Sequence, residues 1–109
     1  MAVSASSREA RAVEAAVASV VGSLGRLDIV SANAGIFSSA RAEEMSEESW
    51  DEMIDVNLKG VYYGMRSGIA AMLETGGGAI VNVTSASGLV GWKGLACYSA
   101  TKAAAVQLT

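Results

Sequence analysis

The 109-residue sequence contains no histidine, no proline and a single cysteine. Without histidine, every catalytic triad built on an imidazole is excluded, and a zinc site is not expected because most zinc sites use histidine or several cysteines. Cys97 cannot form a disulfide within the chain, so the sequence fits a reducing compartment. We therefore expect neither a metal site nor a secreted, disulfide-stabilised domain.

Basic residues and long apolar runs are also scarce. Eight Lys and Arg stand against eleven Asp and Glu, which gives a formal net charge of −3, so a nucleic-acid-binding surface is not expected. The longest uncharged run, residues 75–92, contains five glycines and is too polar to span a membrane. The first 22 residues carry charges where a signal peptide has its apolar core. These features predict a soluble cytoplasmic protein.

The sequence has the composition of a folded chain. Hydrophobic residues make up 51% and charged residues 17%, whereas a disordered chain combines low hydrophobicity with high net charge. Apolar residues recur every three or four positions over residues 6–24 and again over 50–74, which predicts two amphipathic helices. Ser46 is the expected N-cap of the second helix, and the glycines at 76–78 are expected to end it.

Strands are predicted between and after these helices. Residues 27–31 contain β-branched side chains, and residues 79–84 form a nearly continuous apolar strand of the kind that is buried on both faces of a parallel sheet. A loop rich in Gly and Ser follows over 85–96, and a last helix begins near residue 97.

Alternating helices and strands predict an α/β fold with a parallel sheet. Two strands are few for a stable sheet, and the chain opens on a helix and closes within one. We expect a partial Rossmann-like, doubly wound arrangement of two strands and three helices that belong to a larger domain. Ligands of such folds bind beyond the carboxyl ends of the strands, here near residues 31–35 and 84–88.

Tyr98 and Lys102 are the first candidates for chemistry. Four residues apart on one helix, they share a face. A phenol is a poor base at neutral pH because its usual pKa is about 10. An ammonium close to a phenol stabilises the phenolate and so makes it a usable acid or base. Spacing alone is a weak signal, since Tyr62 and Arg66 share it, and an ordinary helix surface is the alternative.

Two serines follow the second strand. Ser85 ends that strand, and its hydroxyl could enter the crevice and bond a substrate carbonyl. Ser87 is an equal candidate by spacing, and either hydroxyl could instead satisfy the backbone of a turn.

Three further features are ambiguous from the residues alone. Asn57 lies within a predicted helix, where an amide can be an ordinary polar-face residue or bond backbone or water. Asn33, Ala34 and Gly35 end the first strand with small residues, which permit close approach of a flat ring or form a simple turn. The two tryptophans and Cys97 are expected to be packing residues.

Four motifs together resemble the short-chain dehydrogenase/reductase family over nearly the whole chain. They are NAG at 33–35, VNLKG at 56–60, IVNVTS at 80–85 and YSATK at 98–102. Their order, spacing and place on strands and helices all match that family. The resemblance implies hydride transfer between a nicotinamide, NAD or NADP, and a small-molecule carbonyl or alcohol. It also implies a homodimer or homotetramer.

The same resemblance implies a role for each catalytic candidate. Tyr98 would be the general acid or base, and Lys102 would favour its phenolate. Ser85 would orient the substrate carbonyl, and Asn57 would hold a water that links Lys102 to solvent.

The resemblance implies cofactor binding by a second set of residues, which overlaps the catalytic candidates. Asn33, Ala34 and Gly35 would line the adenosine side of the cofactor site, while Tyr98 and Lys102 would hold its nicotinamide ribose.

The sequence departs from the family pattern at both ends. It has no glycine-rich turn for the pyrophosphate, no strand that would select NAD or NADP, and no substrate region after the last helix. We therefore expect residues 1–109 to form an incomplete NAD(P)-binding domain that is inactive alone. The alternative is a complete, non-catalytic protein that uses residues 50–73 and its last helix to dock a partner.

Overall fold

The computed structural model describes all 109 residues, arranged in an elongated body of 48 × 24 × 18 Å. The elements, in chain order, are α1 (Ala10–Leu24), β1 (Ile29–Ala32), α2 (Glu47–Met53), the π-helix η1 (Ile54–Lys59), α3 (Gly60–Leu73), β2 (Ala79–Asn82), the 3-10 helix η2 (Ala86–Gly88) and α4 (Ala96–Gln107). The predicted alternation of helices and strands is confirmed. None of the helices combines the length and apolar character needed to cross a bilayer.

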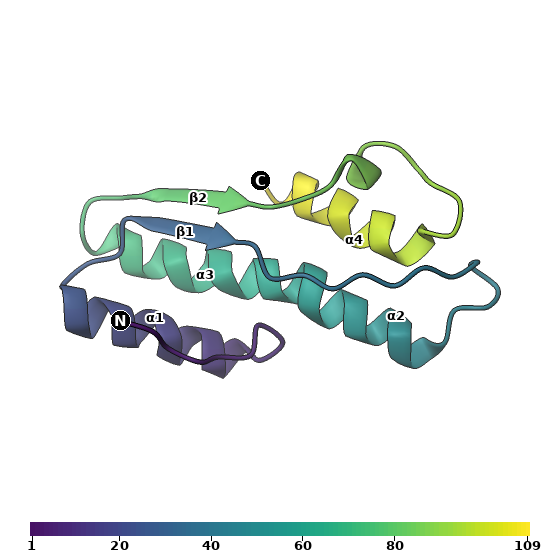
Figure 1. Ribbon diagram of the computed structural model, residues 1–109. Coiled ribbons are helices and arrows are strands. Elements are labelled where there is room, and N and C mark those ends of the chain that lie inside the picture. The colour runs from purple at the N-terminus through teal and green to yellow at the C-terminus, as the bar shows by residue number, and fades with distance from the viewer.

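β1 and β2 form a parallel pair, with Ile29 opposite Ala79 and Ala32 opposite Asn82. A parallel pair needs a long crossover, which α2, η1 and α3 supply. Figure 1 shows α3 running along the two strands, with α1 beside α3. The partial, Rossmann-like α/β arrangement is therefore as predicted.

Only one face of this sheet is covered. Side chains alternate along a strand, and Val30 and Ile80 point towards Gly68 of α3. Ile29 and Val81, on the opposite face, are 67% and 54% exposed. The prediction that residues 79–84 are buried on both faces is therefore wrong for this chain. An apolar strand can be buried on both faces only where a second layer covers the sheet. No helix of this chain covers the face that carries Ile29 and Val81.

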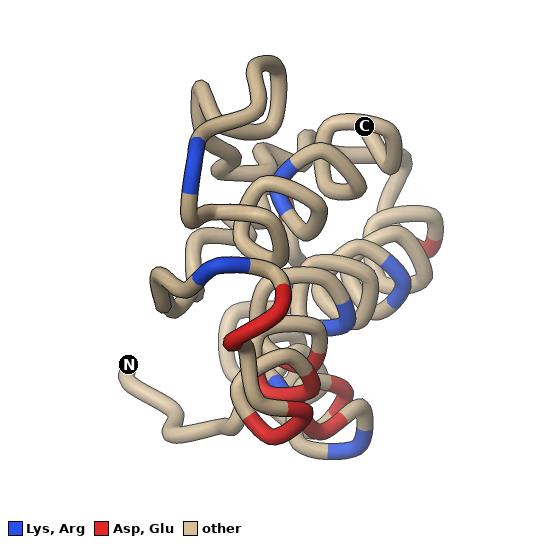
Figure 2. Tube along the Cα trace, turned by 90° about the vertical axis from the view of Figure 1, so that its right-hand side faces the viewer, with Lys and Arg blue, Asp and Glu red and all other residues tan.

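The long crossover helix begins and ends where its capping residues predict. Ser46 accepts a hydrogen bond from the Ser49 backbone N–H at 3.2 Å. Acidic residues gather where α2 begins (Figure 2), and those in the first turn, Glu47 and Glu48, complement the positive end of the helix dipole. At the other end Gly77 has a φ of 112° and donates to the Met72 carbonyl at 2.8 Å.

This helix differs from the prediction in its middle. Residues 54–59 form a π-helix, in which each turn holds an extra residue, between the α-helical segments α2 and α3. Neither proline nor any other sequence signal marks the irregularity. It coincides with Asn57, which is completely buried.

The structure also corrects the predicted start of the first helix, the predicted loop at 85–96 and the predicted packing of the two tryptophans. α1 begins at Ala10 and not at residue 6, and the loop 85–96 contains η2. The two tryptophans predicted to pack are exposed, Trp50 by 42% and Trp92 by 61%. Neither has a covering layer, because Trp50 lies in the short surface helix α2 and Trp92 in the loop before α4.

The buried apolar residues lie mainly where helices meet. They are Met53, Val56, Val61, Met72, Cys97 and Ala105. η1 packs against α4, and α3 packs against α1 and β1. The buried core therefore joins α4 to the middle of the crossover helix.

Gly68 allows α3 to pack closely against the sheet. A Cβ atom at this position would lie 2.7 Å from Cγ2 of Val30, a β-branched and therefore stiff side chain. Gly68→Ala should lower the free energy of unfolding by about 1–3 kcal/mol through overpacking. Gly64→Ala, on the same helix with open space around its Cβ position, should instead raise it by about 0.5–1 kcal/mol. Urea unfolding of the two variants measures both values, and equal effects would contradict the close packing.

Candidate active site

Tyr98 and Lys102 lie one turn apart on α4, as predicted. The Lys102 ammonium is 5.8 Å from the centroid of the Tyr98 ring. Lys102 is only 5% exposed, and its Nζ donates to the Val83 carbonyl at 3.0 Å, just beyond the end of β2. An ammonium has three N–H donors, so two remain for oxygen atoms of a ligand.

A cavity of about 240 Å³ opens beside this pair. Its walls come from the segments that follow β1 and β2 and from the first turns of α4: Asn33, Gly35, Ile36, Phe37, Val83, Thr84, Tyr98 and Lys102. The structure thus brings Asn33 and Gly35, predicted for the cofactor, together with the predicted catalytic pair. Ala34 instead borders an adjoining hollow of about 150 Å³, and Asn33 lies in the walls of both.

Gly35 brings backbone close to Asn57 and Lys102. A Cβ atom there would lie 3.3 Å from Oδ1 of Asn57 and 3.5 Å from Nζ of Lys102. Any side chain would therefore crowd the buried amide and narrow the space beside the ammonium. This agrees with the prediction that small residues at 33–35 permit close approach.

Asn57 joins three segments of the chain. Its Oδ1 accepts from the Ile36 N–H at 2.8 Å, and its Nδ2 donates to the Ile36 carbonyl at 2.9 Å. Nδ2 also donates to Oγ1 of Thr101, in α4, at 3.3 Å. Both amide donors are thus engaged with protein groups. That Asn57 holds a water stays a prediction. The oxygen of such a water would have to accept from other donors, because both N–H groups of the Asn57 amide are occupied.

Ser85 and Ser87 differ in what their hydroxyls do. The Ser85 Oγ accepts from the backbone N–H and the hydroxyl of Ser87, at 3.2 Å and 3.0 Å. Ser87 is buried, and its hydroxyl oxygen lies within hydrogen-bond distance of the Ser85 hydroxyl. Ser85 is less buried than Ser87, which favours it as the hydroxyl that a ligand could reach. Neither serine contributes to the walls of the cavity, which reach only Thr84 on this segment.

Two residues beside Tyr98 were not singled out from the sequence. Phe37 contacts the Tyr98 ring edge-to-face, with 5.1 Å between the centroids. Thr101 is completely buried, and its hydroxyl donates to the Tyr98 carbonyl at 2.8 Å. Thr101 lies within the YSATK motif at 98–102, but the motif implied no role for it. Phe37 is the only phenylalanine of the chain.

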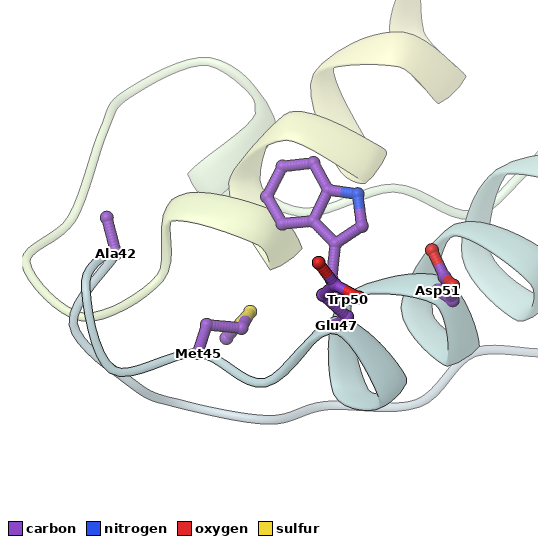
Figure 3. A pocket seen from close by; sticks show the side chains of 5 residues that line it. All are labelled: Ala42, Met45, Glu47, Trp50 and Asp51. Carbon is purple, nitrogen blue, oxygen red and sulfur yellow. The ribbon is translucent and has the colours of Figure 1, made fainter.

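A second, larger hollow of about 480 Å³ lies where α2 begins. Figure 3 shows its lining, and the Trp50 indole is its largest side chain. Glu47 and Asp51 border it, but no three acidic or cysteine side chains of the chain gather as metal ligands would. It shares no lining residue with the cavity beside Tyr98.

Comparison with known proteins gives a consistent result. The family described as short chain dehydrogenase matches residues 1–109. The 3-oxoacyl-(acyl-carrier-protein) reductase FabG of Staphylococcus aureus is 41% identical over 108 residues, which are 99% of this chain and 44% of that protein. A cyclohexanol dehydrogenase of an Acinetobacter species is 41% identical over 106 residues, 96% of this chain and 42% of its own length.

A solved structure supports the same relationship. The structure described as ElxO with NADP bound has a TM-score of 0.92 and is 32% identical, and the match covers 95% of this chain and 42% of that one. The chain therefore spans less than half the length of the relatives it matches.

Removal of the Asn57 amide tests its role as a link. Asn57→Ala leaves the Ile36 N–H and carbonyl without their partner, so the free energy of unfolding should fall by about 2–4 kcal/mol. Urea unfolding measures this loss, and hydrogen exchange at the Ile36 amide should become faster. Asn33→Ala, at an exposed position of the same segment, should change neither. Unchanged exchange at Ile36 would show that the amide does not hold this backbone.

Cys97 provides an independent test of burial beside the site. Burial raises the pKa of its thiol, and thiols react as thiolates. A disulfide reagent at neutral pH should therefore leave the folded protein unmodified and react fully after denaturation. Absorbance of the released thiolate measures the reaction. Rapid modification before unfolding would contradict the packing of α4 against α2.

Proposed function

Because the chain belongs to the short-chain dehydrogenase family, we propose that its protein transfers hydride between NAD or NADP and a carbonyl or secondary alcohol. The observation that supports this most directly is the cavity that Tyr98 and Lys102 share with Gly35. A phenol and a buried ammonium on one wall suit proton transfer, and a bare glycine on another leaves room for a flat ligand. The proposal extends to a cytoplasmic location, which the single reduced thiol of Cys97 fits.

The cavity suits the nicotinamide end of such a cofactor. Two donors of the Lys102 ammonium are available for ribose hydroxyls, and Gly35 leaves the adjacent space open. Asn33 and Ala34 would extend the binding surface into the adjoining hollow. When bound, the reduced nicotinamide supplies the hydride that the protein itself lacks.

The side chains of this segment would manage the proton. In carbonyl reduction the Tyr98 hydroxyl gives its proton to the substrate oxygen, and the Lys102 ammonium stabilises the phenolate that remains. Ser85, which is only partly buried, would donate a hydrogen bond to the same oxygen. Alcohol oxidation reverses each of these steps.

The surroundings of Tyr98 favour a substrate with an apolar body. Phe37 lines the cavity and is 63% exposed. Leu89 and Trp92, in the loop between η2 and α4, are also largely exposed. This loop is joined to the segment after Phe37 by a hydrogen bond from the Ala40 N–H to the Gly94 carbonyl, at 3.0 Å. The two exposed apolar segments are thus held together near the catalytic helix.

The proposed activity belongs to a longer protein. The chain spans 44% and 42% of two enzymes that it resembles, and it contains no glycine-rich turn for the pyrophosphate. We therefore expect the 109 residues alone to show no turnover. Carbonyl reduction by this chain with NADH or NADPH would contradict that expectation.

A non-catalytic docking role is the second candidate. Ile69 and Leu73 leave an apolar stripe exposed along α3, at 45% and 73%. The same stripe could serve the homodimer or homotetramer that we propose for the enzyme. If the protein only docks a partner, Tyr98→Phe should leave partner binding and function unchanged. If it is an enzyme, the same variant should lose activity, which separates the two functions.

The Tyr98 hydroxyl is the decisive group. Tyr98→Phe in the full-length protein should lower kcat for carbonyl reduction about 10²–10⁴-fold, because the proton donor is removed. Affinity for the reduced cofactor, measured by its fluorescence, should fall far less than kcat, because Lys102 would still hold the ribose. Tyr62→Phe is the matched control, since the Arg66 guanidinium lies 5.7 Å from the Tyr62 ring on an exposed helix face. Equal activity of the two variants would refute the proposed acid–base role.

A further inference from the structure

Gly88 makes a backbone-to-backbone contact with the catalytic helix. A Cβ atom at residue 88 would lie 2.8 Å from the carbonyl carbon of Lys102, 2.9 Å from its oxygen and 3.0 Å from the nitrogen of Ala103. Real Cβ atoms do not come this close to backbone, and a helix backbone cannot rotate aside as a side chain can. The φ of Gly88 is not positive, so alanine is excluded by space and not by conformation.

Lys102 is therefore held at both ends by one short segment. Its ammonium donates to the carbonyl of Val83, and its backbone rests against Gly88. Between these two contacts lies the turn that starts at Ser85. The Gly88 N–H donates to the Ser85 carbonyl at 2.9 Å, so one backbone hydrogen bond links the two ends of this turn.

We infer that Gly88 is a positioning residue, which sets the separation between the Ser85 hydroxyl and the Tyr98–Lys102 pair. The inference rests on the proposed function, because it assigns a consequence for turnover to this contact. Only glycine allows the turn to lie directly on α4, and the turn carries Ser85 at its start.

The turn, and not the helix, should yield when a side chain is added. α4 is anchored by three completely buried residues, Cys97, Thr101 and Ala105. Ser87 is the one buried residue of the turn, whereas Ala86 within it and Leu89 directly after it are exposed. Gly88→Ala should consequently displace Ser85 outward and leave Tyr98 and Lys102 in place.

The test compares Gly88→Ala with Gly91→Ala in the full-length protein that contains these residues. Gly91 lies three positions further along the same loop and has open space at its Cβ position. For Gly88→Ala we expect kcat to fall about tenfold or more, since a misplaced reacting group costs rate steeply. Cofactor affinity should stay unchanged, and amide hydrogen exchange should quicken in residues 86–90 but not in α4. Gly91→Ala should match the wild type in every measurement.

The outcomes separate the inference from the proposed function. A Gly88→Ala variant with undiminished kcat, or with unaltered exchange in its turn, overturns the positioning role and leaves the enzyme proposal standing. A parallel loss of cofactor affinity and α4 protection also overturns it, because Gly88 would then only stabilise the helix. Full turnover by Tyr98→Phe refutes the proposed acid–base function, and the inference with it.

Discussion

The buried amide of Asn57 is the constraint on which the arrangement of the site depends. A completely buried amide must find partners, and Asn57 finds them in the Ile36 backbone and in Thr101 of α4. These bonds fix the segment after β1, and with it Gly35, against α4. The π-helix places Asn57 for this task by interrupting the regular ladder of the crossover helix. An irregular turn is thus retained where it organises polar groups.

The position of Lys102 follows from the same packing. A buried ammonium is costly unless it is hydrogen-bonded, and the Val83 carbonyl supplies one partner. Its other donors point to a role beyond stability, because a purely structural position would be served as well by an apolar side chain. Tyr62 and Arg66 illustrate the contrast. They share the spacing of Tyr98 and Lys102, but Arg66 pairs with Glu14 at the surface and borders an apolar groove between α1 and α3.

The sequence predicted what depends on periodicity and caps, and missed what depends on distant contacts. The apolar spacing, Ser46 and the glycines at 76–78 correctly placed the long helix, and the four motifs correctly identified the family. The π-helix was missed because no local signal marks it, and the hydrogen-bond partner of Asn57 within it, Ile36, is 21 residues away. The contact of Gly88 with Lys102 was missed for a similar reason: a glycine in a loop rich in Gly and Ser carries no mark of what lies against it. The two serines also differ in burial, which their spacing does not reveal: Ser87 is buried and Ser85 is partly exposed.

The uncovered face of the sheet shows how the site and the rest of the fold depend on each other. The residues that would handle the proton project from the carboxyl ends of β1 and β2 and from α4, all held by contacts within the chain. The strands themselves expose Ile29 and Val81, so one apolar face of the two-stranded sheet stays open to solvent. Rigid placement of Gly35 and Ser85 at the strand ends therefore requires burial that these 109 residues do not provide. Local contacts determine the geometry of the site, and the covering of the sheet determines how firmly that geometry is kept.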